Sequence, residues 1–147
     1  MKRAIILTVL IALTTLPALC SKSEKNNKDE SVYVPLAKAP RKAQARLNPL
    51  ANDPDAVAAG AKLFDQHCAE CHGDMAQGGK KAPSLRADQV QQATPGTLFW
   101  ILTNGVVRRG MPVWSKLPEP QRWQLVTYIK SLAPASNPGS QNRPPQP

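Results

Sequence analysis

The stretch Cys68-Ala69-Glu70-Cys71-His72 decides how the rest of this sequence is understood. Residues three apart lie on one face of a helical turn, so the thiols of Cys68 and Cys71 can reach the two vinyl groups of one haem and form thioether bonds. His72 follows directly and can place its imidazole beneath the iron. A C-x-x-C-H string is typical of covalent haem attachment. The stretch therefore predicts one covalently bound haem c, with His72 as an iron ligand.

Two other uses of such a string are weaker here. A thioredoxin-like redox pair would need a preceding strand, and no stretch alternates apolar and polar residues well enough to predict one. A zinc site would need a second pair of ligands, and only His67 lies nearby. Because His67 directly precedes Cys68, we expect it on the surface of a helix, pointing away from the haem face that His72 serves.

The ligand on the opposite face of the iron must come from a more distant residue. Met1 lies in a leader, and Met75 is three residues after His72 and cannot easily cross to the other face. Met111 is 39 residues after His72, in a Gly-Met-Pro string that predicts a fixed loop. A lone methionine usually fills a gap in a core, but after a haem motif we interpret Met111 as the second ligand. A His/Met pair raises the reduction potential and suits electron transfer.

Three helices are expected around this motif. The first begins at an N-cap at Asn52 or Asp53, the second at Thr94 and the third near Pro118, while Gly105 ends the second. Each has apolar residues at helical spacing, namely Val57, Gly60, Ala61 and Phe64; Leu98, Ile101 and Leu102; and Leu125, Tyr128, Ile129 and Leu132. The fold class is therefore all-α, with three to five short helices around the haem.

Both ends of the chain are expected to lie outside the folded unit. Residues 1–20 have a basic start, an apolar run too short for a convincing transmembrane helix, and small residues, as in a secretory signal peptide. Residues 21–50 are polar, charged and punctuated by proline, which predicts a flexible spacer. Residues 134–147 hold five prolines in fourteen residues and predict a disordered tail. The domain is therefore expected at 51–133.

The end of the leader leaves two alternatives for anchoring. Cleavage before Ser21 would release a free periplasmic protein. Cys20 also resembles the acceptor cysteine of bacterial lipoproteins, although Leu19 departs from the small residue expected before it. Both alternatives predict export to the periplasm. They allow attachment to a membrane only through a lipid on Cys20 or through a membrane complex.

The formal net charge of +9 is mostly outside the domain, because residues 48–133 hold nine basic and seven acidic side chains. No basic patch interleaved with aromatic residues is present, which argues against a nucleic-acid partner. Arg108 and Arg109 precede the loop at Gly110, Met111 and Pro112, here called the methionine loop, and Lys80 and Lys81 follow the haem motif. We expect these four cations to border the exposed haem edge and to attract an acidic redox protein.

Five strings, taken in order, resemble class I cytochromes c, in particular the small bacterial monohaem ones. They lie within residues 55–133 and read G-A-K-L-F, C-A-E-C-H, A-P-S-L, R-G-M-P-V-W and L-V-T-Y-I-K-S-L. The resemblance implies the cytochrome c fold, in which the first and last helices cross closely. Gly60, Phe64 and Tyr128 match the residues of that crossing.

The resemblance also implies roles around the haem. The carbonyl of Pro83 would accept a hydrogen bond from His72, which would orient the ring and strengthen its donation to the iron. Leu85 would pack on the haem. Trp100 and Trp114 would line the pocket or its rim, although ordinary core packing is an equally good interpretation.

One-electron transfer between exported redox proteins is the function that these features predict. The protein would be a soluble or tethered carrier, or the cytochrome subunit of a respiratory or dehydrogenase complex. No general base or substrate pocket is evident in the sequence, so the chain alone is not expected to be an enzyme. The alternative is a haem-based binder of small ligands or a peroxidase. That alternative needs an open or labile sixth position, and the Gly-Met-Pro string argues against it.

Overall fold

The computed structural model describes residues 31–133. Its elements, with η for a 3-10 helix, are η1 (Ser31–Lys38), α2 (Arg41–Gln44), α3 (Pro54–His67), α4 (Ala69–His72), α5 (Asp88–Gln92), α6 (Pro95–Asn104), η2 (Val107–Arg109) and α7 (Glu119–Ser131). Between residues 31 and 133 there is no strand, and an isolated bridge joins Val106 to Met111. The predicted all-α class is confirmed, but the described residues hold six α-helices rather than three to five, because α2, α4 and α5 are single turns that carry no apolar period. The predicted signal peptide and tail lie outside the described residues.

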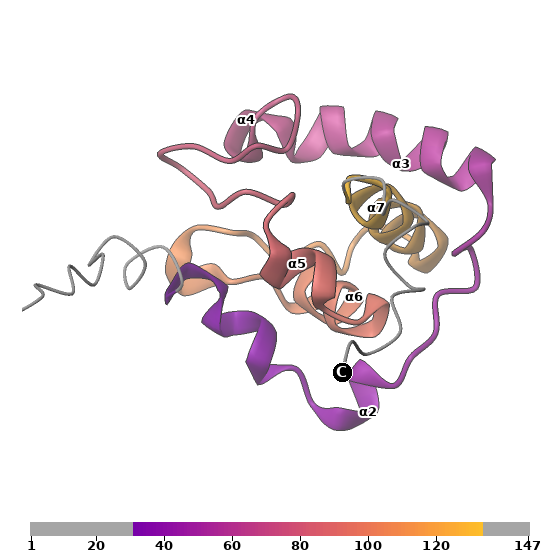
Figure 1. The fold of residues 1–147 in the computed structure, drawn as a ribbon, viewed down its shortest axis with the longest axis horizontal. Helices are drawn as coiled ribbons and strands as arrows, with labels where there is room; N and C mark the ends of the chain where they lie inside the picture. The colour runs from indigo at the N-terminus through magenta and orange to yellow at the C-terminus, as the bar shows by residue number, and fades with distance from the viewer. Residues whose placement is uncertain (1–30, 134–147) are drawn as a thin grey trace, which may run out of the picture.

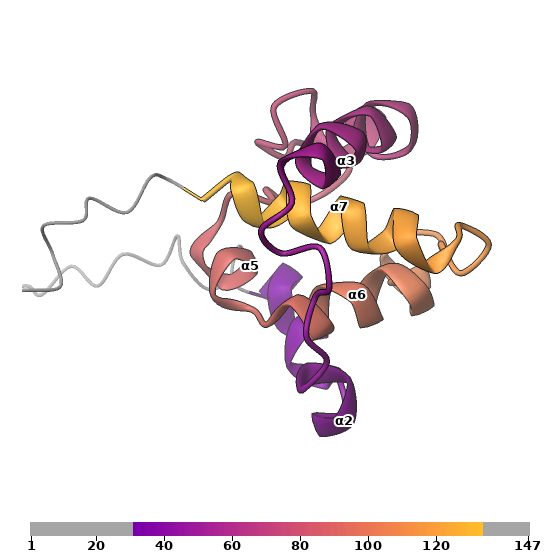
Figure 2. The same cartoon turned by 90° about the vertical axis from the view of Figure 1, so that its right-hand side faces the viewer.

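α3 and α7 cross closely, and α7 lies between α3 and α6 (Figures 1 and 2). The carboxylate of Asp53 caps α3 by accepting the backbone N–H of Asp55 at 2.9 Å. A Cβ at Gly60 would lie 2.1 Å from the backbone oxygen of Gln124, so only glycine allows this approach. The rings of Phe64 and Tyr128 pack beside it, with centroids 5.3 Å apart. The three residues predicted for the crossing therefore meet there.

The core lies between α6 and α7 and beneath α3. Thr94 caps α6 as predicted, because its hydroxyl accepts the backbone N–H of Thr97 at 3.2 Å. Phe99 and Trp123 stack with their ring centroids 4.1 Å apart. The largest fully buried side chains among the described residues are Phe64, Leu125 and Val126. None of the helices within residues 31–133 has the length and apolar character needed to cross a membrane.

The predicted spacer is wrong from residue 31 onward, because residues 31–50, here called the N-terminal segment, pack on the domain (Figure 2). Residues 21–30 lie outside the described part of the chain. Ala39 is buried, and α2 lies so close to α6 that a Cβ at Gly96 would be 2.0 Å from the backbone oxygen of Ala43. The folded unit therefore starts about twenty residues earlier than the sequence pattern predicts.

Polar contacts hold the N-terminal segment in place. The Asn48 side-chain amide donates to the hydroxyl of Thr127 at 2.8 Å. The Arg46 guanidinium lies 2.6 Å from a carboxylate oxygen of Glu119 and 4.4 Å from the centroid of the Phe99 ring. These partners are 53 or more residues away along the chain. A local pattern of apolar residues could not reveal them, which is why the segment resembled a spacer.

Candidate haem site

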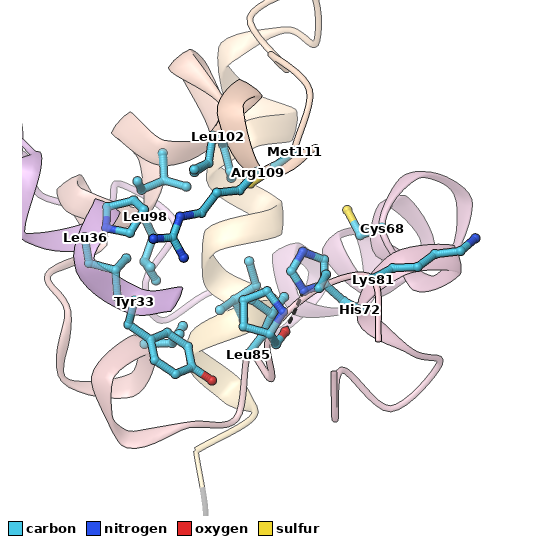
Figure 3. Close-up of a pocket in the computed structure, with 17 residues that line it drawn as sticks. Tyr33, Leu36, Cys68, His72, Lys81, Leu85, Leu98, Leu102, Arg109 and Met111 are labelled. Carbon is cyan, nitrogen blue, oxygen red and sulfur yellow. Dashed lines mark hydrogen bonds between the residues drawn. The ribbon is translucent and has the colours of Figure 1, made fainter. Parts of the chain in front are cut away.

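A cavity of about 850 Å³, counting the part open to solvent, lies between α4, α6, η1 and the methionine loop (Figure 3). Its lining is mainly apolar and includes Leu85, Val90, Leu98, Ile101, Leu102 and Ile129. The cavity can therefore shelter an apolar group from water.

His72 lines the cavity, and one of its two ring nitrogens already forms a hydrogen bond. Its Nδ1 lies 2.8 Å from the backbone oxygen of Pro83, the contact that the resemblance implies. A carbonyl oxygen only accepts, so Nδ1 carries the proton and Nε2 keeps its lone pair. Burial lowers the pKa of His72, and the hydrogen bond to Pro83 opposes that shift in part. The imidazole is therefore neutral at neutral pH and able to bind a metal ion.

The loop after the haem motif folds back on His72 and fixes the carbonyl of Pro83. The backbone N–H of Gly78 donates to the backbone oxygen of His72 at 2.7 Å. Gly78 has a φ of +77°, and a Cβ there would lie 2.4 Å from the backbone nitrogen of Ser84. Glycine is therefore required at this turn, since other residues rarely adopt that φ and none would fit.

The two cysteines of the motif differ in their surroundings. Cys68 is half-buried and lines the cavity beside His72 (Figure 3), whereas Cys71 is exposed and is not part of the lining. Burial raises the pKa of Cys68 to about 11, and the neighbouring Cys71 adds to this shift. Cys68 is therefore a neutral thiol at neutral pH. Neither cysteine forms a disulfide, so both sulfur atoms can form thioether bonds to a haem.

Met111 reaches the same cavity from the loop before α7. Its backbone forms a bridge with Val106: Val106 N–H donates to the Met111 oxygen at 3.0 Å, and Met111 N–H donates back at 3.3 Å. Gly110 has a φ of +88°. Gly105 has a φ of +66°, and a Cβ there would lie 2.6 Å from the backbone oxygen of Pro112. Two glycines thus fix the loop that presents Met111 to the cavity (Figure 3).

The four cations predicted at the haem edge are not equivalent. Arg109 and Lys81 line the cavity, and Figure 3 shows the Arg109 side chain extending into it. Lys81 forms an ion pair with Glu70, with nitrogen and oxygen 2.9 Å apart. Arg108 and Lys80 are exposed and do not line the cavity. Only part of the expected cationic rim is therefore available to a partner.

Trp100 and Trp114 are not part of the cavity lining, so the prediction that they line the haem pocket is wrong. Trp114 instead packs beside His67, with the ring centroids 5.3 Å apart, and its backbone N–H donates to the backbone oxygen of Leu102 at 3.0 Å. His67 is exposed, as expected for a residue on the surface of a helix. Trp114 therefore links the loop before α7 to α3 and α6.

Tyr33, Pro35 and Leu36 also line the cavity, and sequence reasoning missed them. They belong to η1, in the part of the chain that was predicted to be a spacer. The available signal was the short apolar run V-Y-V-P-L at residues 32–36. It was too short, and too far from the haem motif, to be assigned to the site.

Comparisons with known proteins show which proteins this chain is similar to. The family model described as "Cytochrome C oxidase, cbb3-type, subunit III" matches residues 55–129. Subunit CcoP of a cbb3-type cytochrome c oxidase from Azospirillum sp. (strain B510) is 40% identical over 96 residues, covering 58% of this chain and 32% of that protein. Cytochrome c550 of Pseudomonas aeruginosa is 30% identical over 102 residues, covering 67% of this chain and 70% of that protein.

The crystal structure of cytochrome CL from Methylophaga aminisulfidivorans has a TM-score of 0.51 and 26% identity, and the match covers 58% of each chain. The chain spans only about a third of the length of the CcoP protein that it matches. A neutral imidazole with a free nitrogen, two cysteines outside any disulfide and an apolar cavity fit the covalently bound haem that c-type cytochromes carry. The match over 55–129 and the likeness to cytochrome c550 show that this chain belongs to the class I c-type cytochromes and carries haem c.

Proposed function

We propose that this protein transfers single electrons, with His72 and Met111 as the two iron ligands and Cys68 and Cys71 as the thioether attachments. The observation that carries this proposal is the bond between His72 Nδ1 and Pro83, which leaves Nε2 free in a cavity that Met111 also lines. When bound, the haem iron supplies one-electron exchange between its ferric and ferrous states.

The protein's own residues set the conditions for that exchange. Pro83 orients the His72 ring and strengthens its donation, because the hydrogen bond raises the basicity of the imidazole. The apolar lining, which includes Leu85, excludes water. The fixed loop keeps Met111 in one position, so a second ligand is available in both oxidation states. A site filled in this way favours electron transfer over binding of small ligands.

Replacing Met111 tests the proposed ligand set. The oxidised wild-type protein is expected to show the weak long-wavelength sulfur–iron absorption band. Met111→Ala should abolish the band and let cyanide or CO bind, because it removes the sixth ligand. Met75→Ala is the matched control, since Met75 is 66% exposed and outside the cavity lining. A band that persists in Met111→Ala, or disappears in Met75→Ala, would show that the assignment is wrong.

The proposed partners are redox proteins, met either by a carrier or by a cytochrome subunit of a larger complex. Arg108 and Lys80, like Arg109 in the cavity lining, are exposed cations that form no ion pair among the described residues. They would attract an acidic partner, and this attraction is screened over about 8 Å at physiological ionic strength. The rate of electron exchange should therefore fall as salt rises.

Charge removal tests this docking surface. Arg108→Gln with Lys80→Gln should slow exchange with the native partner at low salt and leave the haem spectrum unchanged. Lys62→Gln, an exposed charge on α3, is the control. Equal rates for the wild type, the double variant and Lys62→Gln would show that Arg108 and Lys80 do not take part in docking and serve only solubility.

Export to the periplasm is proposed from the leader at residues 1–20. A lipid on Cys20 would tether the protein, whereas cleavage before Ser21 would release it. Mass spectrometry of the mature N-terminus distinguishes the two, because a diacylglyceryl group adds mass to Cys20. A mature protein that still begins at Met1 would contradict export by this signal.

A further inference from the structure

The haem cavity has a wall that the family match does not include. Tyr33, Pro35 and Leu36 of η1 line the cavity, and the family match begins at residue 55. Figure 3 shows Tyr33 and Leu36 on the side of the cavity away from Cys68. This wall therefore closes the part of the cavity that the haem-attachment motif leaves open.

η1 is held firmly enough to act as a wall. The side chains of Tyr33 and Leu36 pack against the buried core, and Ala39, just after η1, is 4% exposed. α2 follows directly and is fitted against α6 at Gly96. Val34 of the same 3-10 helix is 49% exposed and outside the lining, so one face of η1 is turned to the cavity and another to solvent.

Tyr33 also contacts the loop that orients His72. Its hydroxyl donates to the backbone oxygen of Ser84 at 3.0 Å. Ser84 follows Pro83, whose own carbonyl accepts the hydrogen bond from His72 Nδ1. Tyr33 therefore holds the peptide next to the one that sets the orientation of the His72 ring.

We propose that η1 is part of the haem pocket and helps to set the reduction potential. In this proposal Leu36 keeps water from the cofactor, and Tyr33 is a positioning residue for His72. The proposal rests on the proposed ligation by His72. Water stabilises the more highly charged ferric state, so a wall that excludes water raises the reduction potential. A well-aligned hydrogen bond from His72 to Pro83 has the opposite effect, because a more basic imidazole stabilises the ferric state.

Two variants of the full-length holoprotein separate these effects. Leu36→Ala opens the wall, and we expect a lower reduction potential and faster reduction by a small-molecule reductant. Tyr33→Phe keeps the ring in the wall but removes the bond to Ser84. We expect a higher potential for Tyr33→Phe, because the Pro83 carbonyl becomes less firmly aligned with His72. Val34→Ala is the matched control, and its potential should equal that of the wild type.

The potentials are measured by equilibrium redox titration, alongside haem staining and the sulfur–iron band of each protein. Shifts of opposite sign in Leu36→Ala and Tyr33→Phe, with the band intact, support the proposal. Potentials equal to that of Val34→Ala in both variants would overturn it. Absence of the band in the wild type would instead count against the proposed ligand set. Should Leu36→Ala fail to accumulate as holoprotein, the conservative Tyr33→Phe variant still decides the positioning role by the sign of its shift.

Discussion

The α3–α7 crossing and the docking of α2 on α6 both depend on a glycine that lets another backbone approach. A Cβ at Gly60 would lie 2.1 Å from the Gln124 oxygen, and one at Gly96 would lie 2.0 Å from the Ala43 oxygen. The first contact joins two long helices with aromatic packing. The second joins α6 to a four-residue helix, α2, in which no side chain is buried.

The two glycines therefore lie in regions of different stability. We call the helices α3, α6 and α7 with their buried side chains the framework, and the N-terminal segment is attached to it. Burial of apolar side chains such as Phe64 holds the crossing, so it should open only when the whole domain unfolds. Tyr33 and Leu36 of η1 pack on the core, but residues 40–50 of the N-terminal segment are held by hydrogen bonds and ring contacts of Arg46 and Asn48. These polar contacts are partly exposed, so residues 40–50 should open locally at a lower free energy.

Loss of the haem should have the largest effect, because both regions line or flank the same cavity. A domain of this size buries too little apolar surface to fold firmly with a large cavity left empty. The Cys68→Ser/Cys71→Ser double variant should lose most of its helical circular dichroism. A haem-free protein that still unfolds cooperatively, with native dichroism, would contradict this expectation.

Alanine at the two glycines compares the regions directly. Gly60→Ala should lower the free energy of unfolding of the holoprotein by about 3 kcal/mol or more, since neither helix can shift without breaking the crossing. Gly96→Ala should cost only about 1 kcal/mol, because α2 can detach. Denaturant titration followed by circular dichroism measures both values.

Exchange of backbone amide hydrogens shows which part of the protein each glycine substitution destabilises. In Gly96→Ala, amides of residues 43–46 should exchange faster while those of α7 stay protected. Gly79→Ala is the control, because a Cβ there would meet nothing within 4 Å and its φ is not positive. Equal losses of stability at positions 60 and 96 would mean that the two regions form one cooperative unit.

Arg46 should be the side chain whose removal weakens the N-terminal segment most visibly. Its guanidinium lies 4.4 Å from the Phe99 ring centroid and 5.2 Å from that of Trp123. Such cation–π contacts contribute about 0.5–1 kcal/mol at exposed sites. Arg46→Ala should lower the unfolding free energy by about that amount, and Lys42→Ala, an exposed cation on α2, should leave it unchanged. A similar loss in both variants would point to general charge effects.

The smallest expected effect is on the pH dependence of stability. The hydrogen bond from Arg46, followed by that from Trp123, lowers the pKa of Glu119 below its ordinary value of 4.5. The stabilisation is therefore fully present above about pH 4.5 and is lost as the pH falls through the lower pKa of the folded protein. Glu119→Gln should flatten this part of the curve of stability against pH. An unchanged curve would show that the ion pair contributes nothing.

The framework was predictable because its signals are local. Asp53 and Thr94 are good N-caps at the start of apolar periods, and the structure uses both as caps. The contact of His72 with Pro83 followed from a resemblance carried by two neighbouring strings. Each of these features can be recognised within about twenty residues of sequence.

The η1 wall of the cavity and the pairing of the cations at its rim could not be predicted, because both depend on partners far apart in the chain. Leu36 reaches the cavity only because α2 docks at Gly96, sixty residues later. The ion pair of Lys81 with Glu70 depends on how the intervening loop folds back. Charge and hydropathy describe each residue singly, so they could not show that Lys81 is paired or that a proline-rich stretch is packed.

The close approach at Gly96 also gives a way to sort related cytochromes. Any side chain at that position would collide with the Ala43 carbonyl, so a relative with a larger residue there cannot carry α2 in the same place. Such a relative must leave its haem pocket open on that side or close it with different residues. One position in α6, far from the haem motif, thus indicates whether a family member shares the N-terminal wall.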